Sequence, residues 1–268
     1  MSPSACEIET ASDSPPICAH DRVLSILGVH ITDVSKARAL QMLQTMIAAR
    51  DGRARAVYFV NTHTLNCAAA DESYRRVLNS ATCVFGDGTG VRWAARLQGV
   101  RVRDNLCGTD LTPALLSTAD QPPRRYFLLG GTEALIHVAA EKARALFPHW
   151  NLAGFHHGYL GDPKLNDNAI AAINAAAPDV LLVGMGNPLQ ERWIDANRRR
   201  LHVPLCLGVG GLFHYWADDL KRTPRWLRRL GMEWLGILCQ QPQKAARYLA
   251  GNPLYLGRVV RERCRGRA

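Results

Sequence analysis

The sequence predicts an α/β fold in which a parallel sheet is covered by helices on both of its faces. Two observations lead to this prediction. Short apolar segments alternate along most of the chain with longer segments in which apolar residues recur at helical spacing. Several of the short segments are apolar throughout, such as V-L-L-V-G at 180–184, which is typical of strands that are buried on both sides in a parallel sheet.

The first half of the chain contains three expected strands and the helices that follow them. The strands are Val23–Val29, Ala56–Val60 and Thr82–Phe85. The first helix is expected to begin at Asp33 or Ser35, because either side chain can cap it, and to run through Ala49. Further helices are expected over Leu65–Asn79, Val91–Leu97 and Leu106–Thr118.

Pro122 and Pro123 separate these elements from a second run of the same kind. Its strands are expected at Arg125–Leu129, Leu152–His156, Val180–Gly184 and Pro204–Val209. Its helices are expected over Glu133–Phe147, over Leu165–Ala176 and in a segment that ends at Arg200. We therefore expect residues 21–216 to form one core around a parallel, Rossmann-like sheet with helices on both faces.

The two ends of the chain differ from this core. Residues 1–20 lack the basic and apolar regions of a signal peptide and are expected to be a disordered leader. Residues 217–268 show helical patterns only, over Trp226–Cys239, from Pro242 to about Leu249, and over Pro253–Arg263. Such a segment is too short for a domain with its own core. We expect a basic helical appendage that packs on the core, on a membrane surface or on both.

The positive charge of the chain is concentrated in this appendage. The formal net charge is +10, and residues 221–268 hold twelve lysines and arginines against two glutamates, so the first 220 residues are neutral. A basic segment that also contains tryptophans can bind anionic lipid, nucleic acid or a phosphate-rich substrate. A solvated helical face is the other interpretation. We expect an anionic membrane surface and no nucleic acid among the partners.

The eight cysteines are scattered and form no C-x-x-C motif, and most lie in apolar surroundings. This favours buried thiols in a reducing cytoplasm over disulfides or a zinc site. His63 and the pair His156–His157 have no third ligand at a fitting spacing, so no metal site is predicted. No apolar run reaches the roughly 18 residues of a membrane-spanning helix.

Polar or glycine-rich turns follow four of the expected strands. V-F-G-D-G-T-G at 84–90 places Asp87 between glycines, and the other turns are N-T-H-T at 61–64, G-G-T-E at 130–133 and G-M-G-N-P-L-Q-E at 184–191. The carboxyl ends of parallel strands lie at one edge of the sheet, where open α/β sheets bind ligands. We therefore expect these turns to converge there.

The turns allow two interpretations. Asp87 is either part of a ligand site or a solvated turn residue. Gly130, Gly131 and Thr132 open a helix, so their backbone N–H groups can hold a phosphate, although a purely structural turn fits as well. Asn61 and Gln190 can both donate and accept hydrogen bonds, which suits hydroxyl-rich ligands, or they can stabilise the turns.

Eight motifs fit one pattern, in the same order along the chain. They are V-N-T-H-T-L-N-C-A-A at 60–69, V-F-G-D-G-T-G at 84–90, C-G-T-D-L at 107–111, F-L-L-G-G-T at 127–132, G-M-G-N-P-L-Q-E-R-W-I at 184–194, G-V-G-G-L-F at 208–213, K-R-T-P-R-W at 221–226 and M-E-W-L at 232–235. In these motifs the chain resembles the WecG/TagA/CpsF family of bacterial glycosyltransferases (glycosyltransferase family 26). The resemblance covers roughly residues 23–260.

The resemblance implies an inverting glycosyltransferase. The family usually takes a hexose or N-acetylhexosamine-type sugar from a UDP-sugar to a polyprenyl-diphosphate-linked saccharide, in the synthesis of exopolysaccharide and other cell-surface polysaccharides. By the same resemblance the enzyme is cytoplasmic and peripherally associated with the inner face of the plasma membrane. Apolar helix faces in the appendage suit either lipid or a second subunit of a homo-oligomer.

The resemblance also implies roles for residues of the four turns and the appendage. Asp87 matches the proposed general base, the single carboxylate that an inverting transfer needs. The expected substrate-binding residues are Asn61, Thr62, Gly88, Gly131, Thr132, Gly186, Asn187, Gln190, Glu191, Arg222, Lys244 and Arg247. Because the sequence has no Asp-x-Asp metal motif, no metal cofactor is expected, and arginines of the appendage are expected to take the place of Mg²⁺ at the diphosphate.

The chain departs from the family pattern at three positions. Asn105 and Ile237 stand where many relatives carry arginine, with Arg103 as a candidate replacement for the first, and His214 stands where relatives often carry aspartate. These departures indicate a changed acceptor or a reduced activity. Two alternatives therefore stay open, a nucleotide-sugar-binding protein without transferase activity and a nucleotide-dependent oxidoreductase. The absence of a dinucleotide-binding fingerprint counts against the oxidoreductase.

Overall fold

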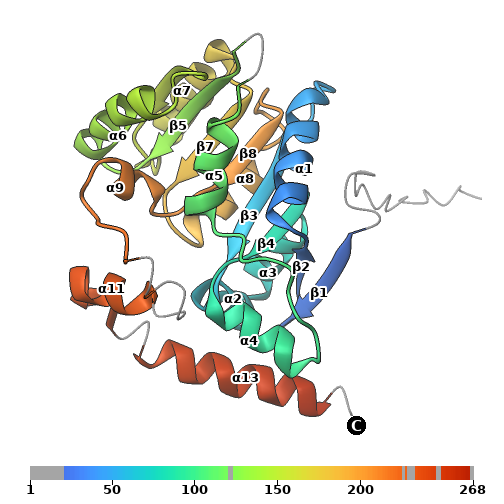
Figure 1. Cartoon of the computed structure of the whole chain (residues 1–268). Coiled ribbons are helices and arrows are strands. Elements are labelled where there is room, and N and C mark those ends of the chain that lie inside the picture. The colour runs from blue at the N-terminus through green and yellow to red at the C-terminus, as the bar shows by residue number, and fades with distance from the viewer. Residues whose placement is uncertain (1–20, 120–122, 225–226, 228–232, 246–248, 266–268) are drawn as a thin grey trace, which may run out of the picture.

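A computed structural model describes residues 21–119, 123–224, 227, 233–245 and 249–265 (Figure 1). It contains a six-stranded sheet in the order β4-β3-β8-β7-β5-β6, and every neighbouring pair in it is parallel. The strands are β3 (Arg55–Val60), β4 (Cys83–Gly86), β5 (Arg125–Gly130), β6 (Asn151–His156), β7 (Val180–Gly184) and β8 (Leu205–Gly208). The predicted α/β fold with a parallel, Rossmann-like sheet is confirmed. The expected disordered leader, residues 1–20, lies outside the described residues.

Helices cover both faces of this sheet (Figure 1). One face packs against α1 (Lys36–Ala48), α5 (Gly108–Leu116), α6 (Glu133–Leu146) and α9 (Leu212–Trp216). The other packs against α2 (Thr62–Ala70), α3 (Glu72–Asn79), α4 (Thr89–Leu97), α7 (Pro163–Ala176) and α8 (Leu189–Asn197), and α13 (Gly251–Arg265) packs on two of these helices. Side chains alternate along each strand, so Leu182 belongs to the first core whereas Leu181 and Val183 belong to the second.

The prediction of one strand over Val23–Val29 is wrong, because the segment turns in its middle. β1 (Arg22–Ile26) and β2 (Val29–Asp33) form an antiparallel hairpin in which Ile26 pairs with Val29. The two residues between them, Leu27 and Gly28, have φ angles of 52° and 75°. Positive φ at both central residues is the geometry that matches the twist of a two-residue hairpin.

The expected helix Leu65–Asn79 is divided into α2 and α3 at Asp71. This residue is extended, with φ −133° and ψ 103°, and its side chain accepts a hydrogen bond from the backbone N–H of Tyr74. It therefore ends one helix and caps the next. Helix α1 begins as expected, because the Ser35 side chain caps it.

The last described helix, α13, matches the helix expected over Pro253–Arg263 and packs on α2 and α4 (Figure 1). Tyr255 is buried and its hydroxyl donates to the carbonyl of Gly90 at 3.1 Å. Before it, α11 (Glu233–Gln240) and η1 (Pro242–Lys244) lie within segments where helices were expected. None of the helices in the described part of the chain is long and apolar enough to cross a membrane.

Only some of the described cysteines are buried, as was expected for them. Cys83, Cys107 and Cys206 are buried, whereas Cys239 and Cys264 are exposed, so the expectation of burial is wrong for these two. The six cysteines within the described ranges are free thiols.

Candidate active site

The carboxyl ends of all six strands of the parallel sheet open onto one cavity of about 920 Å³. Its lining includes the turns after β3, β4, β5, β6, β7 and β8, together with side chains from α11 and α13. A cavity of roughly 300–1,000 Å³ is typical of small-molecule sites. The turns that the sequence analysis singled out therefore lie around one space, at the edge where open α/β sheets bind ligands.

Asp87 lies in the turn between β4 and α4, on the cavity wall. Its backbone N–H donates to the carbonyl of Val60 at 2.8 Å, which ties the turn to β3. Gly88 follows with a φ of 88°, a conformation that favours glycine, and its N–H donates to Oδ1 of Asn105 at 2.6 Å. Among the described residues that line the cavity, Asp87 is the single aspartate or glutamate.

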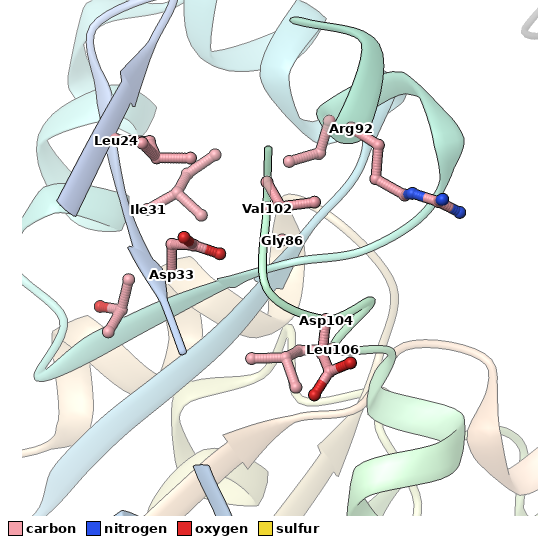
Figure 2. Close-up of a pocket in the computed structure, with 10 residues that line it drawn as sticks. Leu24, Ile31, Asp33, Gly86, Arg92, Val102, Asp104 and Leu106 are labelled. Carbon is pink, nitrogen blue, oxygen red and sulfur yellow. The ribbon is translucent and has the colours of Figure 1, made fainter. Parts of the chain in front are cut away.

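A second, small cavity of about 10 Å³ is lined by Gly86 at the end of β4, by Asp33 and Asp104, and by Arg92, which also lines the main cavity (Figure 2). Asp33, one of its lining residues, accepts hydrogen bonds from Nε of Arg22 at 2.7 Å and from the backbone N–H of Arg103 at 2.8 Å. The backbone N–H of Leu106 donates to the carbonyl of Gly86 at 3.1 Å. These bonds fix the segment that precedes α5, in which Asn105 accepts the hydrogen bond from the Gly88 N–H. The space is about that of one water molecule, roughly 10–15 Å³, and we assign it a structural role.

Asn61 ends β3 and caps α2. Its Oδ1 accepts from the backbone N–H groups of His63 and Thr64 at 3.0 and 3.2 Å. Nδ2 of Asn61 makes no hydrogen bond to another described residue, and the side chain lines the cavity. Asn61 therefore combines a capping role with a donor that a ligand can use. Thr62 lines the cavity beside it.

The turn after β7 brings three polar side chains together. Asn187 and Gln190 line the cavity, as does Gly186, but Glu191 is fully buried behind them. Oε1 of Glu191 accepts from Nδ2 of Asn187 at 2.5 Å and from Nε2 of Gln190 at 2.7 Å, and Oε2 accepts from the Tyr74 hydroxyl at 3.0 Å. Oε1 of Gln190 accepts from the backbone N–H of Gly210 at 2.9 Å.

Burial raises the pKa of Glu191 from 4.5 to about 7, although the three hydrogen bonds oppose the shift by favouring the carboxylate. Between these two values the folded protein keeps a proton that the unfolded chain releases. The contribution of Glu191 to stability is therefore complete below pH 4.5 and is lost as the pH rises to about 7.

We expect the free energy of unfolding, measured in urea, to fall by up to roughly 3 kcal/mol more in wild type than in Glu191→Gln across this pH range. Glu72→Gln is the control, because Glu72 is exposed and pairs only with Arg76 on the same helix. Equal pH dependence in wild type and Glu191→Gln would contradict the assignment.

Two predicted residues of the turn after β5 differ in position. Gly131 lines the cavity, whereas Thr132 is not part of the described lining. Oγ1 of Thr132 accepts from the backbone N–H of Leu135 at 3.2 Å and caps α6. The structure thus gives Thr132 a capping role.

Of the three predicted basic residues, only Arg222 has a described side chain, and it is not among the described lining residues. Arg222 binds Asp110 through Nη1 at 2.5 Å, and Nη2 donates to Oγ1 of Thr109, a cavity residue, at 3.0 Å. The side chain of Lys244 and all of Arg247 lie outside the described part of the chain. Within the described lining, Arg92 is the one lysine or arginine. Its place in the first turn of α4, five residues after Asp87, is the signal that could have identified it from the sequence.

The three departures from the family pattern all line the cavity: Asn105, His214 and Ile237. Nδ1 of His214 lies 2.6 Å from Oδ2 of Asp219. Arg103, the candidate replacement for the arginine missing at Asn105, is not among the described lining residues. No group of three or more potential metal ligands occurs among the residues that the structure describes.

Taken together, the parallel sheet and the cavity at its carboxyl edge define a Rossmann-like α/β protein with a candidate ligand site at that edge. The model of the family "Glycosyl transferase WecG/TagA/CpsF" matches residues 24–268, so the chain belongs to this family of glycosyltransferases. The resemblance inferred from the eight motifs is confirmed.

Two relatives show the extent of the similarity. The chain is similar to an N-acetylglucosaminyldiphosphoundecaprenol N-acetyl-beta-D-mannosaminyltransferase from Bacillus subtilis (strain 168), with 32% identity over 203 residues, which are 76% of this chain and 78% of the relative. A protein with the same name from Staphylococcus aureus (strain MW2) is 26% identical over 239 residues, which are 89% of this chain and 92% of that protein.

Proposed function

We propose that the chain is an inverting glycosyltransferase that moves a hexose or N-acetylhexosamine-type sugar from a UDP-sugar to a polyprenyl-diphosphate-linked saccharide, in the synthesis of exopolysaccharide or another bacterial cell-surface polysaccharide. Membership of the family supports glycosyl transfer. The names of the relatives, with an N-acetylmannosaminyl group and a diphosphoundecaprenol-linked acceptor, support the sugar type and the lipid-linked acceptor. The observation that carries the proposal is the single carboxylate, Asp87, among the described residues of the cavity lining.

One carboxylate is enough for a single displacement. In the proposed reaction the acceptor hydroxyl oxygen bonds to the anomeric carbon of the donor sugar, and the bond from that carbon to the UDP oxygen breaks. UDP leaves with the electron pair, and the carboxylate of Asp87 takes the hydroxyl proton. Inversion follows because the attack and the departure occur on opposite faces of the sugar.

The negative charge on the leaving diphosphate must be stabilised by positive charge or hydrogen-bond donors. We propose that cationic side chains and backbone N–H groups supply it, with no metal cofactor. Arg92 on the cavity wall and Gly131 at the start of α6 support this proposal. The helix N-terminus adds a favourable field for an anion.

We further propose that the enzyme works at the inner face of the plasma membrane, where a lipid-linked acceptor would be presented. Segment 221–268 carries the whole net charge of the chain, which favours an anionic lipid surface. Leu254 and Val260 on α13 are exposed and can contact lipid. The same apolar side chains also fit a second subunit of a homo-oligomer.

Release of UDP by the purified protein tests the proposal. With a panel of UDP-sugars and a short-chain polyprenyl-diphosphate-linked N-acetylglucosamine, we expect UDP to appear only when both substrates are present. Binding of a UDP-sugar without turnover over a broad acceptor panel would favour the nucleotide-sugar-binding alternative. If neither UDP nor any UDP-sugar binds, the proposed function is wrong.

A further inference from the structure

Glu191 is a buried carboxylate that does not line the cavity but contacts two side chains that do. It is fully buried, and its Oε1 receives the amide nitrogens of Asn187 and Gln190. Tyr74 of α3 fixes the other oxygen, and the hydroxyl of Tyr58 in β3 donates to the Glu191 backbone carbonyl at 3.2 Å. Residue 191 is thus held through its side chain by α3 and through its backbone by β3, so its position does not depend on a ligand.

The chemistry of a carboxylate decides which way the two amides point. Oε1 of Glu191 accepts from both amide nitrogens, so this oxygen carries no proton whether the group is ionised or protonated on Oε2. Each amide therefore turns its nitrogen toward Glu191 and its oxygen away. The Gln190 oxygen is then used by the backbone N–H of Gly210. Oδ1 of Asn187 makes no hydrogen bond to any residue in the described ranges, and Asn187 forms part of the cavity wall.

We propose that Glu191 is a positioning residue that holds the carbonyl oxygen of Asn187 available to the ligand, so that this part of the cavity selects a hydrogen-bond donor. The Asn187 oxygen accepts a hydrogen bond from an O–H or N–H group of the ligand, as in a sugar hydroxyl, an acetamido group or a uracil ring. The reversed amide would instead offer an N–H to a phosphate oxygen. We call Glu191 with the amides of Asn187 and Gln190 the clamp. It directs the diphosphate of the substrate away from Asn187. The identity of that substrate rests on the proposed function.

The size of the effect follows from what an unsatisfied polar group costs. If Glu191 is replaced by leucine, the Asn187 amide is free to rotate and the two amide nitrogens lose their acceptor. Loss of one oriented hydrogen bond at a desolvated site corresponds to roughly a 10- to 100-fold loss of affinity. Glutamine at position 191 keeps one oxygen that can accept from both amides, so Glu191→Gln is the conservative variant.

The first experiment measures the side-chain amide of Asn187 by NMR, with no ligand present. Its N–H signals are identified by their disappearance in Asn187→Ala. We expect Glu191→Gln to retain protected N–H signals and Glu191→Leu to lose the protection against exchange. Identical protection in wild type and Glu191→Leu overturns the clamp, whatever the protein binds.

The second experiment measures dissociation constants for UDP and UDP-N-acetylglucosamine by calorimetry, and the Michaelis constant of the short-chain lipid-linked acceptor. Glu191→Leu and Asn187→Ala are each expected to lower the affinity for the same ligand 10- to 100-fold. The double variant should lose no more affinity than the single variant with the larger loss. Glu191→Gln should stay within about threefold of wild type. Tyr58→Phe, which removes the donor to the Glu191 backbone carbonyl and leaves the contacts of its carboxyl group in place, is the matched control. It should leave that constant unchanged while lowering the melting temperature.

The ligand that responds tells which substrate meets Asn187, and a purely structural role would affect all three constants alike. Additive losses in the double variant, or uniform losses across the three ligands, overturn the positioning role. If the wild type binds none of the three, the proposed function is wrong while the NMR result still decides the clamp.

Discussion

Replacement of Asp87 by asparagine is expected to lower the rate of sugar transfer by about 10²–10⁴-fold, which is the usual contribution of a general base. Asparagine keeps the shape of the side chain and removes its ability to take a proton. Asp87 is the single carboxylate among the described residues of the cavity wall, so no neighbour within that part can replace it. The rate of UDP release at saturating donor and acceptor measures the effect.

The dissociation constant of the UDP-sugar should change by no more than a few-fold in the same variant, because a base that acts on the acceptor contributes little to donor binding. Asp104→Asn is the matched control. Asp104 lies outside the main cavity lining, next to Asn105, and accepts from the backbone N–H of Lys36 at 2.8 Å. Asp87→Asn with near wild-type turnover would remove Asp87 from the chemistry.

The sheet could be predicted because its strands are apolar throughout and separated by helical segments. Periodicity alone did not reveal two breaks. Leu27 and Gly28 turn the chain inside a run of apolar residues, and only glycine at the second position hints at it. Asp71 divides a segment whose helical spacing continues on both sides, because its extended backbone ends α2 and its carboxylate caps α3.

The candidate site could be predicted as far as it is built from strand ends. Parallel strands bring their carboxyl ends to one edge whatever their order, so Asn61, Asp87 and Asn187 meet without knowledge of the topology. Tyr255 could not be found this way, since its hydroxyl reaches Gly90 from a helix 165 residues further along the chain. Neither could the burial of Glu191, because a motif gives the spacing of two neighbours but not which of them faces the cavity.

Substitution of Gly130 by alanine is expected to destabilise the fold by roughly 3–5 kcal/mol, the sum of backbone strain and overpacking. Gly130 ends β5 with a φ of 147°, in a region that disfavours side chains. A Cβ there would lie 2.3 Å from the carbonyl oxygen of Gly184 on β7 and 2.5 Å from its carbonyl carbon. These are backbone atoms of a neighbouring strand in the middle of the sheet, so they cannot move without breaking the ladder.

Urea unfolding of Gly130→Ala and of Gly161→Ala tests this expectation, because a Cβ at Gly161 meets nothing within 4 Å and should be nearly neutral. A Gly130→Ala protein within about 1 kcal/mol of wild type would contradict the steric argument. The comparison also separates two roles of the Gly130–Gly131 pair. Close packing of β5 on β7 accounts for Gly130, whereas Gly131 lines the cavity. A phosphate-binding role, one of the two interpretations that the sequence allows for this turn, would therefore depend on Gly131, and Gly130 is needed for the sheet that places it there.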